Sequence, residues 1–273
     1  MQAQRCAQFP AQAGKIASIM LVCALVLCQF FRARDMAQKT APPSTRLRVL
    51  DETIVACRKC PRLVRYRENV AHTKRRAYRD CEYWGKPVPG FGDPRAELFI
   101  VGLAPAAHGG NRTGRAFTGD RSGDFLYAAL HRAGFANQPM SASRDDGLVL
   151  RNAYIGMAVR CAPPANKPLP SEVHSCRPYL ETELDILRPK AVLALGGFAL
   201  RAYLQILKDK KLLLNQAQYP FRHGAVYMLP GDLPRVFVSY HPSQQNTFTG
   251  RLTSTMLVGV LAEIGNYLRT LAV

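Results

Sequence analysis

Four short apolar runs in this sequence alternate with segments in which apolar residues recur at helical spacing. Each run is partly β-branched or aromatic and is bounded by glycine, proline or charged residues, which is typical of buried strands. The runs are residues 98–101, 153–159, 191–195 and 236–240. The helical segments are residues 46–56, 122–133, 171–187, 197–208 and 252–271. Strands that alternate with helices predict an α/β fold in three layers, with a central, mostly parallel four-stranded sheet flanked by helices.

The loop after the first expected strand, residues 102–120, is rich in glycine. It leaves the carboxyl end of that strand, where open α/β sheets bind their ligands. Its five glycines let the backbone approach a ligand closely. An aromatic ring, a carboxylate and two guanidinium groups lie among the glycines, in Phe117, Asp120, Arg112 and Arg115. The loop therefore predicts a pocket that holds a flat group beside an anionic one.

Two further loops are expected at the same edge of the sheet. Residues 241–251 follow the last strand, and His241 can donate a hydrogen bond to negative charge on a leaving group. In the same loop, Ser243 and Arg251 can hold a phosphate. The third loop follows the second strand and carries Asn166, which can face a substrate or a phosphate. Because the strands are expected to be parallel, we predict that the three loops converge on one site.

Four of the eight cysteines are spaced as candidate metal ligands. They form one close C-x2-C pair and two widely separated cysteines near prolines: Cys57, Cys60, Cys161 and Cys176. Four thiolates can hold a tetrahedral zinc ion or a [4Fe–4S] cluster. Zinc ribbons usually carry two close pairs, but the spacing alone leaves open zinc, an iron–sulfur cluster and inert buried thiols.

The charge balance is strongly basic, with 37 Lys and Arg against 19 Asp and Glu and a formal net charge of +18. Such an excess favours a polyanionic partner, which can be DNA, RNA or an anionic membrane surface. Aromatic residues make up 9% of the chain and charged residues only 21%, and this argues against a disordered basic tail protein.

The N-terminal part of the chain contains an apolar run at residues 16–31. The run is slightly shorter than the roughly 18 residues of a membrane span, and no signal-peptide cleavage pattern follows it. It is a membrane anchor, a targeting segment, or the product of an upstream start codon, and we favour a start at Met36. We expect residues 1–44 to form an extension and residues 45–273 to form a single domain.

Together these features resemble the uracil-DNA glycosylase superfamily, best its iron–sulfur branch, family 5, with family 4 as a cousin. The resemblance spans residues 50–271. It is carried by the Gly-Leu-Ala-Pro to Phe-Thr-Gly-Asp string of residues 102–120, by the four cysteines, and by His241-Pro242-Ser243. It implies a repair enzyme that rotates a damaged nucleotide out of DNA and hydrolyses its N-glycosidic bond, leaving an abasic site. The alternative is a non-catalytic iron–sulfur protein that binds nucleic acid, which would not need both Asp120 and His241.

The resemblance also implies roles for single residues in the chemistry. Phe117 would stack on the everted base, and His241 would bind the base carbonyl that gathers charge. Asp120 would position the water or stabilise the sugar cation. Gly102 and Ala104 would line the base pocket.

Base selectivity is expected to be loose. The asparagine that recognises uracil in the sister family falls near Gly156 and Met157, and neither side chain can take its place. Asn166 would replace it in part. We therefore expect uracil as the first substrate, with hypoxanthine or bulkier cytosine adducts also accepted.

The remaining expectations concern the metal group and the partners. The resemblance implies a [4Fe–4S] cluster rather than zinc on the four cysteines. Double- and single-stranded DNA with damaged bases would be the partner, through Arg112, Arg115, Ser243 and Arg251. The protein would act as a monomer in the cytoplasm, without a stable membrane partner.

Overall fold

The computed structural model describes residues 40–271. The chain divides into two units, residues 1–46 and residues 47–273, and the account below concerns the second unit. The apolar run expected at residues 16–31 lies outside the described residues. Within residues 40–271, no helix has both the length and the apolar character needed to cross a bilayer.

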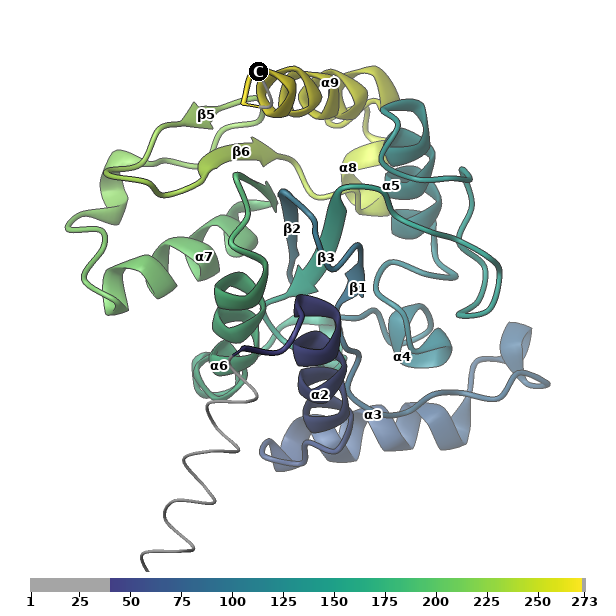
Figure 1. The fold of residues 1–273 in the computed structure, drawn as a ribbon. Coiled ribbons are helices and arrows are strands. Elements are labelled where there is room, and N and C mark those ends of the chain that lie inside the picture. The colour runs from purple at the N-terminus through teal and green to yellow at the C-terminus, as the bar shows by residue number, and fades with distance from the viewer. Residues whose placement is uncertain (1–39, 272–273) are drawn as a thin grey trace, which may run out of the picture. The chain divides into compact units, whose positions relative to one another are not determined.

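A six-stranded sheet forms the centre of the second unit, in the order β1-β3-β2-β4-β6-β5 (Figure 1). Its four central strands are parallel and confirm the four strands expected from the sequence, with small shifts at their ends: β2 (Leu98–Gly102), β3 (Ala153–Met157), β4 (Ala191–Leu195) and β6 (Arg235–Ser239). Two short antiparallel strands at the edges were not predicted: β1 (Phe91–Gly92) beside β3, and β5 (Val226–Tyr227) beside β6.

Helices cover both faces of this sheet. The four helical segments expected after the first strand are α5 (Arg121–Arg132), α6 (Pro170–Leu187), α7 (Gly197–Asp209) and α9 (Ser254–Thr270). The other helices are α2 (Pro43–Val55), α3 (Pro61–Thr73), α4 (Gly110–Thr113) and α8 (Gln244–Phe248). Short 3-10 turns occur at Arg76–Tyr78, Pro164–Asn166 and Gln216–Gln218.

The pleat of the strands divides the buried residues into two cores. Along β2, Phe99 and Val101 point to a core shared with α6 and α7, whereas Leu98 and Ile100 point to a core shared with α5 and α9. All four side chains are fully buried, and burial of such a side chain contributes about 1.5–3 kcal/mol. The expected three-layer α/β architecture is therefore confirmed.

The parallel strands fix where the loops emerge. Gly102 at the end of β2 pairs with Met157 at the end of β3, and Leu195 of β4 pairs with Ser239 of β6. The connections that follow these strands therefore leave the sheet at one edge, as the sequence predicted.

Candidate active site

Phe117 and His241 lie side by side, with ring centroids 5.8 Å apart and planes inclined by 36°. Phe117 comes from the glycine-rich loop after β2, and His241 comes from the loop after β6. Gly102 permits this arrangement, because a Cβ atom there would lie 2.9 Å from the Phe117 ring. Two segments distant in the sequence thus bring an aromatic face and an imidazole together, as expected.

Phe117 is held in an uncommon backbone conformation. Its φ angle is +51°, a region that few residues other than glycine adopt. The Phe117 carbonyl packs directly on α5, where a Cβ atom on Gly123 would overlap it. Phe117 is 8% exposed. The conformation is thus imposed by the packing between the loop and α5, and it fixes the direction of the ring.

Asp120 is the N-cap residue of α5. Its Oδ1 accepts a 3.0 Å hydrogen bond from the backbone N–H of Gly123, and its Oδ2 lies against the backbone of Gly109. Burial raises the pKa of Asp120, while the N–H groups of Gly123 and Ser122 act in the opposite direction. A partly desolvated carboxylate is a stronger base than one in water, and is suited to orient a water molecule.

His241 is neutral at physiological pH. Burial lowers its pKa from 6.5 to about 4. Its carbonyl accepts a 2.8 Å hydrogen bond from Nδ2 of Asn246. Gly196, with φ of +92°, leaves room beside it, because a Cβ atom there would lie 3.2 Å from the Cβ of His241. A neutral imidazole retains one N–H donor, which can be aimed at a developing negative charge.

A cleft of about 610 Å³ opens beside Asp120. Asn166 lines it from the loop after β3, and Gln244 and Phe248 line it from α8. Asp120 and Asn166, both predicted site residues, therefore share one cavity. Phe117 and His241 are outside the lining of this cleft, and the short segment 117–120 connects the ring pair to it.

The floor beside the ring pair is apolar. Cγ of Met157 lies 3.5 Å from the position that a Cβ atom on Gly102 would take. A Cβ atom on Gly156 would instead meet Glu183 and Phe99, which belong to the interior. Ala104 is half-buried and packs against the α6 and α7 core. None of Gly156, Met157 and Ala104 has a polar side chain to bind a base edge.

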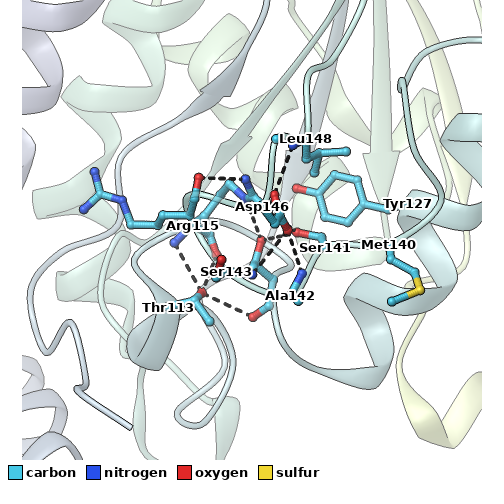
Figure 2. Close-up of polar contacts among 12 residues, drawn as sticks. Thr113, Arg115, Tyr127, Met140, Ser141, Ala142, Ser143, Asp146 and Leu148 are labelled. Atoms are coloured by element: carbon cyan, nitrogen blue, oxygen red, sulfur yellow. Dashed lines mark hydrogen bonds and ion pairs between the residues drawn. The ribbon is translucent and has the colours of Figure 1, made fainter.

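Arg115 does not face DNA, and the sequence-based prediction for it was wrong. Its side chain is 5% exposed and makes two hydrogen bonds of 2.8 and 2.7 Å to the carboxylate of Asp146 (Figure 2). It also donates to Ser141 Oγ at 2.7 Å and to Thr118 Oγ1 at 3.0 Å. These partners occupy the guanidinium inside the protein, so it cannot reach a phosphate.

Arg112 is also used within the glycine-rich loop. It donates from Nε to the carbonyl of His108 at 2.9 Å and from Nη2 to the carbonyl of Gly119 at 2.8 Å. Its guanidinium lies 4.1 Å from the centre of the Tyr78 ring. These contacts hold the loop in shape, and a phosphate contact by Arg112 stays a prediction.

Ser243 and Arg251 lie at the two ends of the segment that follows His241. Ser243 precedes α8 as its N-cap residue. Arg251 is exposed, with its guanidinium 4.6 Å from the centre of the Tyr240 ring. Both positions are at the expected edge of the sheet, and their contacts with DNA stay predictions.

The four predicted cysteine ligands interact electrostatically with one another. The pKa of Cys161 is raised to about 12, mainly by burial, with Arg67 acting in the opposite direction and the charges of Cys176 and Cys57 adding to the rise. The pKa of Cys176 is likewise raised to about 11, mainly by burial, with the backbone N–H and the charge of Arg160 lowering it and Cys60 and Cys57 raising it. Cys161 and Cys176 also belong to one buried cluster, against which Cys57 and Cys60 pack, so thiols from the loop before α3, from the loop after β3 and from α6 lie together.

Two N–H donors point at these sulfur atoms. Nη1 of Arg67 donates to Cys161 Sγ at 3.0 Å, and the backbone N–H of Arg160 donates to Cys176 Sγ at 3.3 Å. Such donors stabilise thiolates that bind a metal group. In residues 40–271, no three His, Cys, Asp or Glu side chains are already arranged as ligands of a metal ion. The four-thiol donor set and its N–H donors fit a metal group in chemical type.

Several cleft residues were not singled out from the sequence. His108 lies in the glycine-rich loop, and its Nδ1 is 3.0 Å from the hydroxyl of Tyr83. Arg121 is an exposed cation at the start of α5, and Phe248 is 72% exposed. An imidazole among glycines and a large aromatic residue among polar neighbours were the available signals.

The sequence matches a family of known proteins. The sequence model of the uracil DNA glycosylase superfamily matches residues 89–265. The Type-5 uracil-DNA glycosylase of Thermus thermophilus is 52% identical over 213 residues, which cover 78% of this chain and 94% of that protein. The Mycobacterium tuberculosis Type-5 enzyme is 51% identical over 216 residues, or 78% and 79% of the two chains. The Type-4 enzyme of Pyrobaculum aerophilum is 30% identical over 198 residues, or 72% and 83%.

Proposed function

We propose that this chain, which belongs to the uracil-DNA glycosylase superfamily, hydrolyses the N-glycosidic bond of uracil in DNA and leaves an abasic site. The observation that carries the proposal is that the Phe117–His241 ring pair and Asp120 lie in loops that leave the same edge of the parallel sheet. The alternative of a non-catalytic nucleic-acid-binding protein is not favoured, because the matching relatives are named as glycosylases.

The ring pair acts on the departing base. In the transition state the sugar resembles an oxocarbenium ion and the base departs as an anion. Phe117 stacks on the everted uracil, and the N–H of His241 donates to the carbonyl oxygen on which negative charge collects. Since burial keeps His241 neutral, the imidazole donates this hydrogen bond as an uncharged group. Loss of one such donor typically slows a reaction by about 10²–10³-fold.

Asp120 acts on the sugar side of the bond. The N–H of Gly123 fixes one carboxylate oxygen, and the residue borders the cleft that Asn166 shares. From this position the carboxylate orients the attacking water and stabilises the positive charge on the sugar. General base catalysis of this kind contributes about 10²–10⁴-fold.

The same site supports broad base selectivity. The apolar floor of Gly102 and Met157, together with Ala104, leaves recognition of the base to backbone groups and to Asn166. Deaminated purines such as hypoxanthine are therefore proposed as further substrates, in double- or single-stranded DNA. Bulkier cytosine adducts are proposed as well.

We assign a [4Fe–4S] cluster to Cys57, Cys60, Cys161 and Cys176, with zinc as the alternative. The supports are the convergence of four thiols and the N–H donors from Arg67 and Arg160. When bound, the group would cross-link α3, the loop after β3 and α6. The residues around it would then hold the loop that carries Asn166 in place.

The proposal also covers the cell compartment and the assembly. Because the proposed substrate is DNA, we propose that the protein acts with the DNA in the cytoplasm. One copy of the chain contains the residues of the proposed site. We therefore propose a monomer without a membrane partner.

The test is a cleavage assay on a duplex with a single uracil, followed by alkaline cleavage at abasic sites. The purified full chain is expected to release uracil and, more slowly, hypoxanthine. Absence of abasic sites in both substrates would refute the proposed activity.

A further inference from the structure

The connection between α5 and β3, residues 133–152, is much longer than the link between these elements requires. Most helix-to-strand connections have about 2–6 residues, and longer ones are usually functional. This one folds into an antiparallel arm: Ala136 pairs with Leu150, and the N–H of Asn137 donates to the carbonyl of Val149 at 3.1 Å. Its tip, residues 138–147, reaches the glycine-rich loop, where the N–H of Gly119 donates to the carbonyl of Ser141 at 2.9 Å.

The tip is fixed by an ion pair between Asp146 and Arg115, the arginine that the sequence analysis had assigned to DNA. The carboxylate of Asp146 accepts hydrogen bonds from the backbone N–H groups of Ala142 at 2.7 Å and Leu148 at 3.1 Å, as well as from Arg115 (Figure 2). Ser141 Oγ lies 2.6 Å from Thr118 Oγ1. A buried ion pair holds one geometry when its remaining bonding positions are satisfied. The tip is therefore a rigid extension of the glycine-rich loop.

The rigid tip presents an apolar side chain beside Asp120. Met140 is 65% exposed, and Figure 2 shows it pointing away from the Arg115–Asp146 contacts. It lines a second cleft of about 290 Å³, together with Asp120, Arg112 and Arg121. The first cleft, which Phe248 lines, also contains Asp120 and Arg121. Asp120 therefore lines two clefts, and each has an exposed apolar side chain in its lining: Phe248 in the first and Met140 in the second.

We propose that the tip of residues 138–147 is a second DNA-contacting arm, in which Met140 packs against the duplex beside the everted nucleotide. This inference rests on the proposed function. Rotation of a nucleotide out of a duplex costs a few kcal/mol of stacking and pairing. An apolar side chain that contacts the exposed base and sugar faces offsets part of this cost. Arg121, an exposed cation in the same cleft, is placed to meet a phosphate.

The arm is expected to assist cleavage in duplex DNA and not in a single strand. Rotating a nucleotide out of a single strand breaks no base pair, so there is less cost for the arm to offset. The test compares kcat/KM on a duplex with one uracil and on the same strand alone, for wild type, Met140→Ala and Met140→Leu. We expect Met140→Ala to lower duplex kcat/KM by roughly tenfold with little effect on the single strand, as follows from losing part of a buried methionine contact. Met140→Leu should restore most of the duplex activity.

Met228 provides a matched control. It is 76% exposed and follows β5, which runs antiparallel to β6 and therefore ends at the sheet edge opposite the site. Met228→Ala should leave both substrates unchanged. Equal losses on duplex and single strand, or no loss in Met140→Ala, would overturn the arm. A wild-type chain inactive on both substrates would instead overturn the proposed function.

Discussion

Gly109 and Asp120 are packed so closely that a Cβ atom on Gly109 would overlap Oδ2 of the Asp120 carboxylate. The other oxygen, Oδ1, is held by the N–H of Gly123. The position of the carboxylate is thus set from both sides, by the start of α5 and by a glycine in the loop after β2.

The first prediction concerns this contact. Gly109→Ala should lower the rate of uracil release by roughly 100-fold, because the added methyl group displaces the carboxylate that orients the water. Single-turnover kinetics and circular dichroism would separate this from unfolding. Gly259→Ala is the control, since no atom lies within 4 Å of a Cβ there; a Gly109→Ala enzyme as fast as this control would contradict the role given to Asp120.

The second prediction is a pH dependence. Because the pKa of His241 is lowered to about 4, its titration should not affect the rate near neutral pH. Activity should fall on the acid side, through protonation of Asp120 at a pH above the usual aspartate value of 3.8. Asp120→Asn should remove this acid limb from the pH–rate profile. A fall in rate centred near pH 6.5 that disappears in His241→Ala would contradict the prediction that His241 stays neutral.

His241 also links stability to pH. The folded chain takes up its proton only at about pH 4, whereas the unfolded chain takes it up at 6.5. The unfolded state therefore binds more protons in this window, and the contribution of His241 to stability should fall as the pH drops from 6.5 to about 4. Urea unfolding of wild type and His241→Gln at both pH values measures the difference.

The third prediction distinguishes the buried Arg115, which pairs with Asp146, from the exposed Arg251, which is assigned to DNA. Arg115→Met should destabilise the fold by about 3–5 kcal/mol, since it leaves Asp146 buried without its partner. Arg251→Ala should leave the melting temperature unchanged. It should also reduce the slope of log DNA affinity against log salt concentration by about 1, the amount expected for one lost phosphate contact. An unchanged slope in Arg251→Ala would contradict its assignment to DNA.

The fourth prediction concerns the metal group. Cys161→Ser should lose iron and acid-labile sulfide and should melt at lower temperature, because cross-links between three segments are lost. Cys81→Ser, at a half-buried thiol, is the control and should keep full iron content. Zinc in place of iron in the wild-type protein would favour the alternative metal.

The pairing of Phe117 with His241, and the location of Asp120 at the same edge of the sheet, were predictable because parallel strands release their loops at one edge. The role of Arg115 was not, since its partner Asp146 is 31 residues away in a polar loop without a periodic pattern. The edge strands Phe91–Gly92 and Val226–Tyr227 were also missed, because two residues are too few to show an alternation.

The most direct measurement is single-turnover release of uracil from a duplex by wild type, Asp120→Ala and His241→Ala, with DNA affinity measured in parallel. Each variant should be slower by at least about 100-fold while its affinity for DNA is retained. Wild-type rates in both variants would contradict the assignment of this sheet edge as the active site.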